Sequence, residues 1–121
     1  MGVNSLAAVV ALAVLFISAS INLAEANCKV KNDSGKKVII IPVEVDITIE
    51  VDVGAVVEIP PPQQKCSFKN PETGHKSEPV TLKDGSTYVC KEGFVKGTID
   101  VYLGVYVLGI LQLSAQIIIG L

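Results

Sequence analysis

The segment VEVDITIEVDV, from Val43 to Val53, alternates β-branched apolar residues and polar residues without a break. Successive side chains of a β-strand point to opposite faces, so a strand would place every apolar residue of this segment on one side. A helix would scatter the same residues around its axis. The pattern therefore predicts one long strand with a buried apolar face, which includes Ile47, and an acidic face in solvent.

Short runs rich in Val, Ile, Thr and Tyr recur along the rest of the chain, with turn-forming residues between them. The pair Asp84-Gly85 lies between two such runs, which is typical of a β-hairpin. No internal repeat is evident. Several short strands at this spacing predict an all-β protein, a small antiparallel β-sandwich or partly open barrel that forms a single domain, residues 27–121.

The N-terminal residues have the pattern of a secretory signal. Leu6 to Ile21 is an apolar run that is short for a membrane span, and it is followed by the small-x-small sequence Ala24-Glu25-Ala26. We therefore expect residues 1–26 to be a cleaved signal peptide and the mature protein to be secreted. An uncleaved N-terminal anchor is the alternative.

Three cysteines, Cys28, Cys66 and Cys90, lie in the mature part of the chain. Disulfides persist in secreted proteins, and an odd number of cysteines leaves one sulfur over after one bridge. A bridge between Cys66 and Cys90 would close a loop of about two dozen residues and stabilise the fold by roughly 3 kcal/mol. We expect this pair, with Cys28 unpaired or bonded to a second chain. A bridge between Cys28 and Cys90 is the alternative.

Asn32-Asp33-Ser34 is an N-glycosylation sequon, and the glycine that follows it indicates a turn. A turn makes a sequon accessible in a secreted protein. The sequence therefore predicts glycosylation of Asn32.

Residues that would support catalysis, cofactor binding or metal binding are few. His75 is the only histidine, and no nucleophile motif, phosphate-binding loop or C-x-x-C pair accompanies it. The carboxylates of the alternating segment could attract Ca²⁺, but a flat strand spreads them apart, so a solvated polar face explains them better. Arginine is absent, which argues against nucleic-acid binding. We expect neither an enzyme nor a bound cofactor or metal.

The C-terminal segment, Val101 to Leu121, carries no charged side chain. Its alternation and its glycines predict two strands that meet near Gly109 and pack on the core. The apolar positions expected to face the core are Leu111, Leu113, Ala115 and Ile117, against Gln112, Ser114 and Gln116 on the other face. A GPI-type signal and a membrane-inserting element are the alternatives for residues 101–121.

These features predict a secreted, disulfide-containing protein that works by binding rather than by catalysis. The partner would be an extracellular protein, a glycan or a second copy of the chain as a homodimer. One alternative is a membrane-active protein, pore-forming or anchored, that uses the uncharged C-terminal β-hairpin. Another is a self-assembling extracellular structural protein, because long Val- and Ile-rich strands can stack edge to edge.

Overall fold

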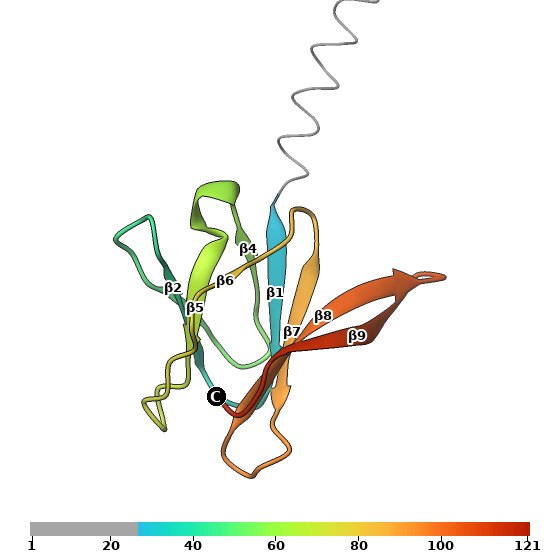
Figure 1. Ribbon diagram of the computed structural model, residues 1–121. Helices are drawn as coiled ribbons and strands as arrows, with labels where there is room; N and C mark the ends of the chain where they lie inside the picture. Colours follow the sequence, from blue (N-terminus) through green and yellow to red (C-terminus); the bar gives the residue numbers. More distant parts are fainter. Residues whose placement is uncertain (1–26) are drawn as a thin grey trace, which may run out of the picture.

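The computed structural model describes residues 27–121, so the predicted signal peptide, residues 1–26, lies outside the described residues (Figure 1). None of the described residues belongs to a helix long and apolar enough to cross a membrane. In chain order the elements are β1 (Cys28–Asp33), β2 (Val38–Pro42), β3 (Ile49–Val51), β4 (Val56–Ile59), a single 3-10 turn η1 (Pro61–Gln63), β5 (Lys65–Lys69), β6 (Val80–Thr81), β7 (Thr87–Glu92), β8 (Ile99–Val107) and β9 (Ile110–Ile118).

The strands form two sheets, which confirms the all-β prediction. Sheet A has five strands in the order β4-β1-β7-β8-β9, and sheet B has four strands in the order β3-β2-β5-β6. The two sheets are not joined into a closed barrel.

The expectation of a purely antiparallel arrangement is wrong at one place, because β1 and β7 pair in parallel. The chain leaves β6 in sheet B, crosses to sheet A, and enters β7 at the end where β1 begins: the amide of Lys29 donates to the carbonyl of Ser86, just before β7. Both strands therefore run in the same direction. Every other strand pair is antiparallel.

One hydrophobic core lies between the facing sides of the two sheets, in a sandwich-like arrangement. Its buried side chains come from both sheets, which therefore depend on each other to exclude water. Sheet A contributes Cys28, Val30, Ile59, Tyr88, Cys90, Ile99, Val101 and Ile118, and sheet B contributes Val38, Ile40, Val51, Cys66 and Phe68.

The long strand predicted from Val43 to Val53 is wrong, since only Ile49–Val51 forms a strand there. Val43, Ile47 and Val53 are 50%, 41% and 61% exposed, so the predicted burial of Ile47 is also wrong. Val51 is fully buried.

The reason is that the chain reverses direction inside the alternating segment. β2 ends at Pro42, and β3 returns antiparallel to it, with Val38 opposite Val51. Residues 43–48 form the connection, and the amide of Ile47 donates to the carbonyl of Val45 at 2.9 Å. Such a contact between residues two apart is a tight turn, which interrupts the strand geometry on which the alternation depends.

Val51 and Val53 provide a test of which side chains in this segment are buried. We expect Val51→Ala to lower the free energy of unfolding by about 2 kcal/mol, because it removes buried methyl groups and leaves a cavity. Val53→Ala should change it by less than about 0.5 kcal/mol, because that side chain is already in solvent. Urea unfolding followed by circular dichroism measures both variants, and equal losses would contradict the structure.

Candidate functional site

The C-terminal hairpin extends away from the body of the molecule (Figure 1). β9 pairs with β8 from Val101 to Val107, and the two strands meet at Leu108-Gly109, which confirms the two predicted strands and their turn near Gly109. We call residues 105–113 the arm, and the rest of the hairpin its base.

The arm exposes apolar side chains to solvent. Leu108 is 97% exposed, Ile110 is 64% exposed and Tyr106 is 63% exposed. No charged side chain interrupts them, because the chain carries none from Val101 onward. Exposed apolar residues that lie together mark interaction sites more often than single exposed ones do. The arm is therefore the strongest candidate for a binding element in the described part of the chain.

The turn of the arm adds a second unusual feature. Leu108 has φ 52° and Gly109 has φ 80°, so both residues of this two-residue turn adopt left-handed backbone conformations. Hairpin turns of this type favour Asn-Gly or Asp-Gly, because a branched apolar side chain is strained at positive φ. The chain places a leucine at the most exposed position of the arm in spite of that strain. Strained positions of this kind cluster at functional sites.

No strand within residues 27–121 pairs with the outer edge of β9, because β9 is the last strand of sheet A. It is nine residues long and contains neither a charge nor a proline. Natural edge strands usually carry such residues to prevent pairing with another chain. The other sheet edges are shorter, with four residues in β4, three in β3 and two in β6.

The base of the hairpin is held in place by Asp100. Its buried carboxylate accepts hydrogen bonds from Gln116 Nε2 at 2.9 Å and from the backbone amide of Gly120 at 2.8 Å. Ile118 and Leu121 are in the core, and the backbone of Leu121 pairs with that of Ile99 in both directions. The base is therefore part of the folded domain, whereas the arm is not covered by it.

The predicted core face of β9 is correct only in part. Leu113 is 44% exposed and Ala115 is exposed, while Leu111 and Ile117 are half-buried. Two shifts in the β8–β9 register break the simple alternation, and the outer half of the hairpin lies beyond the part of sheet A that sheet B covers. Ile118 is buried in the core, and the predicted Ile117 packs against the core from a partly buried position.

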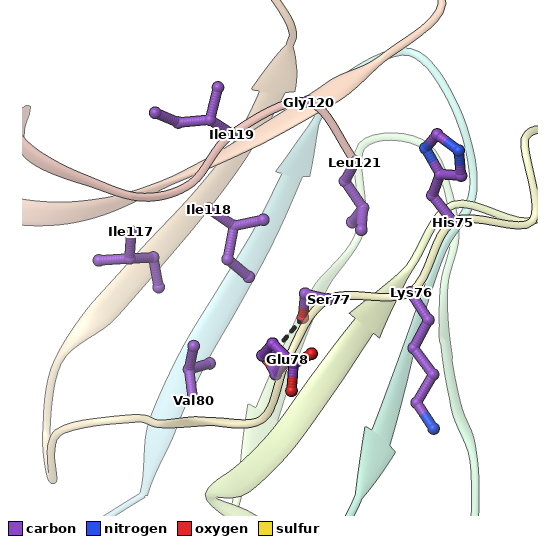
Figure 2. Close-up of a pocket in the computed structure, with 10 residues that line it drawn as sticks. All are labelled: His75, Lys76, Ser77, Glu78, Val80, Ile117, Ile118, Ile119, Gly120 and Leu121. Atoms are coloured by element: carbon purple, nitrogen blue, oxygen red, sulfur yellow. Dashed lines mark hydrogen bonds between the residues drawn. The ribbon is translucent and has the colours of Figure 1, made fainter.

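A groove of about 340 Å³ lies at the base of the hairpin, between the end of β9 and the segment His75–Val80. Figure 2 shows Ile118, Leu121 and Val80 pointing into this space, with His75 at its rim. The hydroxyl of Ser77 donates to the backbone oxygen of Glu78 and accepts from the amide of Phe68. The groove is thus an open depression with an apolar wall from the end of β9 and a polar wall that includes His75, Lys76 and Glu78.

The acidic residues of the alternating segment are not brought together. Glu44 and Asp46 lie in the β2–β3 connection, while Glu50 and Asp52 face Lys37 at 2.7 Å and 3.8 Å. The hydrogen bond and the charge of Lys37 lower the pKa of Glu50. Within residues 27–121, no group of three or more His, Cys, Asp or Glu residues is arranged to hold a metal ion.

Asn32 has a structural role that the sequon did not indicate. It is fully buried, and its Nδ2, the atom that would carry a glycan, donates to the carbonyls of Lys36 at 2.6 Å and Val51 at 2.9 Å. Its Oδ1 accepts from the amide and the hydroxyl of Ser34. These bonds fasten the β1–β2 turn to β3. Glycosylation of Asn32 stays a prediction, and a glycan there would have to replace the bonds that Nδ2 makes in this structure.

All three cysteines are buried, and none is bonded to another in the structure. The predicted bridge between Cys66 and Cys90 is therefore not formed in it. Cys28, which we expected to be unpaired or bonded to a second chain, begins β1 and is fully buried.

Comparison of the chain with protein-family models, with curated proteins and with solved structures finds no match in any of the three. The arm is therefore identified from its geometry and chemistry alone.

Asn32 and its neighbour Asp33 provide a test of the buried amide. Asn32→Asp should lower the free energy of unfolding by more than about 2 kcal/mol, because it places a carboxylate against backbone carbonyls. Asp33→Asn keeps the sequon and changes a partly exposed residue, so its effect should stay below about 1 kcal/mol. Denaturant unfolding measures the stability, and intact mass reports any glycan. A stable Asn32→Asp variant would contradict the structural role.

Leu108 provides a second test. Leu108→Asn should raise the free energy of unfolding by about 0.5–1 kcal/mol, because asparagine tolerates the left-handed conformation of this turn better than leucine does. Leu108→Ala is the control, since it removes the same apolar side chain but keeps a residue that is strained at positive φ. If Leu108→Asn and Leu108→Ala are equally stable, relief of backbone strain at residue 108 does not explain a gain in unfolding free energy.

Proposed function

We propose that this protein is a secreted β-sandwich module that works by binding, and that the arm is its binding element. The observation that carries the proposal is the combination of exposed apolar residues, a strained and fully exposed Leu108, and an unpaired edge strand at one place. The N-terminal signal-like sequence supports the extracellular setting.

The partner that fits the edge of β9 best is a second copy of the chain. In a twofold-symmetric antiparallel pairing of β9 with β9, each residue faces β9 of the other copy, so a charged strand would meet like charge. β9 has no charge. Its polar residues carry amide and hydroxyl groups that both donate and accept hydrogen bonds. With Ser114 at the twofold axis, Ser114 would lie opposite its own copy, and Gln112 would lie opposite Gln116 of the second copy.

The other edges favour a closed dimer over a filament. A filament needs a second free edge on each copy that can pair in turn. The remaining edge strands have two to four residues, and β4 and β3 carry Glu58 and Glu50. Pairing through β9 therefore uses the only long edge among the described strands, which supports a dimer rather than a self-assembling structural protein.

Sedimentation equilibrium of residues 27–121 tests this proposal. We expect a reversible monomer–dimer equilibrium and no larger species. A short-arm variant, in which Asn-Gly replaces residues 105–112, should remain folded, because the base with Asp100 and Ile118 is unchanged. It should be monomeric, because it lacks the exposed apolar side chains of the arm and the first three residues of the β9 edge.

A matched pair of single substitutions provides the control. Ile110→Ser should weaken the dimer at least about tenfold, because a buried apolar side chain at an interface contributes more than about 1.4 kcal/mol. Val53→Ser removes an equally exposed apolar side chain, 61% against 64%, at a place outside the arm and should have no effect. A wild-type protein that stays monomeric at all concentrations would contradict the proposal.

A membrane-active protein is the second candidate, and the exposed tip of the arm favours it. Tyr106, Leu108 and Ile110 could enter the interface of a bilayer, where tyrosine and aliphatic side chains are both accommodated. Flotation with uncharged phosphatidylcholine vesicles distinguishes the two candidates, because the arm has no basic residue for anionic lipids. If the wild-type protein binds the vesicles and the short-arm variant does not, the result supports membrane activity. If the wild-type protein does not bind, the result favours the dimer.

A further inference from the structure

Three thiols share the core between the two sheets. Cys28 is on β1 and Cys90 is on β7, both in sheet A, while Cys66 is on β5 in sheet B. All three are fully buried members of the same cluster. The strand registers show which of them are at the same level of the core.

Cys28 and Cys90 are at different levels. β1 and β7 pair in parallel, with Asn32 opposite Cys90, and Asn32 is four residues along β1 from Cys28. Four residues of a strand span roughly 13 Å. A disulfide requires Cα atoms within about 7 Å, so the register excludes a bridge between these two residues.

Cys66 is at the level of Cys28. The ladder partner of Cys28 is Ile59, whose carbonyl accepts a hydrogen bond from Gln64 Nε2 at 3.2 Å. Gln64 is two residues before Cys66, and its carbonyl accepts from the amide of Leu82. The next residue, Lys83, accepts a hydrogen bond from the thiol of Cys28 at 2.7 Å.

The opposite end of β5 lies near the opposite end of β7. Asn70, just beyond β5, donates through Nδ2 to the carbonyl of Gly97 at 3.2 Å, and Gly97 lies in the connection that follows β7. β5 and β7 therefore run in the same sense, with Cys66 near the start of β5 and Cys90 near the end of β7. Cys66 faces Cys28 across the core rather than Cys90.

The effects of the thiols on each other agree with this placement. Burial raises the pKa of Cys66 to about 12, and the charge of Cys28 adds to the increase. Burial also raises the pKa of Cys90 to about 12, but there the added charge is that of Asp33. The neighbouring charge that raises the thiol pKa is therefore that of Cys28 for Cys66 and that of Asp33 for Cys90.

We infer that Cys28 and Cys66 form a disulfide that joins sheet A to sheet B when the protein folds under oxidising conditions, and that Cys90 remains a buried thiol. This pairing differs from both bridges expected from the sequence. The oxidant is a small-molecule disulfide such as glutathione disulfide. The thiolate of one cysteine attacks it, forms a mixed disulfide and releases one glutathione thiolate. The thiolate of the other cysteine then attacks the protein sulfur of the mixed disulfide, forms the Cys28–Cys66 bond and releases the second glutathione thiolate.

Two protein thiols are oxidised and one glutathione disulfide is reduced, so atoms and electrons balance, and the two protons pass to the released glutathione thiolates. The disulfide forms during folding and not in the folded protein. In the folded protein, burial excludes the oxidant and disfavours the thiolate that must attack it. The bridge closes before the sheets pack completely.

Refolding of reduced residues 27–121 in a glutathione redox buffer tests the pairing. After acid quenching, the remaining thiols are alkylated in guanidinium and the protein is digested with trypsin without reduction. Lysines place each cysteine on its own peptide, residues 27–29, 66–69 and 84–91. We expect the first two peptides to be linked and the third to be alkylated. The oxidised protein should also melt on the order of 10 °C higher than the reduced protein.

Cys90→Ala should keep the bridge, whereas Cys28→Ala and Cys66→Ala should each leave two alkylatable thiols. A link from residues 84–91 to either other peptide would overturn the inference, and so would three alkylated cysteines in the oxidised, folded wild type. Because the assay follows covalent connectivity in the isolated chain, its failure is distinguishable from the failure of arm-mediated binding.

Discussion

The structure depends on one constraint, which is that the two sheets bury their apolar faces only where they cover each other. Sheet B is the smaller sheet, with edge strands of three and two residues in β3 and β6. The hairpin of sheet A has nine residues in each strand. The outer half of the hairpin therefore has no opposing layer, and the apolar pattern that continues through Val105, Val107 and Ile110 is left in solvent.

This mismatch separates the hairpin into a base and an arm with different physical roles. Asp100, Ile118 and Leu121 integrate the base into the domain. Within residues 27–121, the arm is held by the ladder between its own strands, from Val105 opposite Gln112 to Val107 opposite Ile110, and by the Leu111 side chain, which lies against Gly104. Substitutions in the arm can therefore alter binding without altering the core. This separation is what makes the proposed function testable by mutation.

Part of the fold is predictable from local sequence patterns, and part is not. The two C-terminal strands and their turn follow from the alternation around Gly109, because register and turn chemistry are local. The alternation from Val43 to Val53 predicts one long strand incorrectly, because an alternating pattern does not show where the chain reverses direction. Only Pro42, which ends β2, signals the break. The parallel pairing of β1 with β7, the level of Cys66 and the exposure of the arm all depend on contacts between distant segments. The burial of Asn32 also depends on a distant segment, because its side-chain amide donates a hydrogen bond to the carbonyl of Val51. The sequon does not indicate this contact.

Hydrogen–deuterium exchange of β9 at low and high protein concentration tests the arm-mediated dimer most directly. In the monomer, the amides of Ile110–Ile118 that point away from β8 have no strand partner among the described residues and should exchange rapidly. In a β9–β9 dimer they donate to the second copy. We expect these amides to become protected as the concentration rises, while the amides of β4, at the other edge of sheet A, do not change. Exchange in β9 that is rapid and independent of concentration would rule out the β9–β9 dimer.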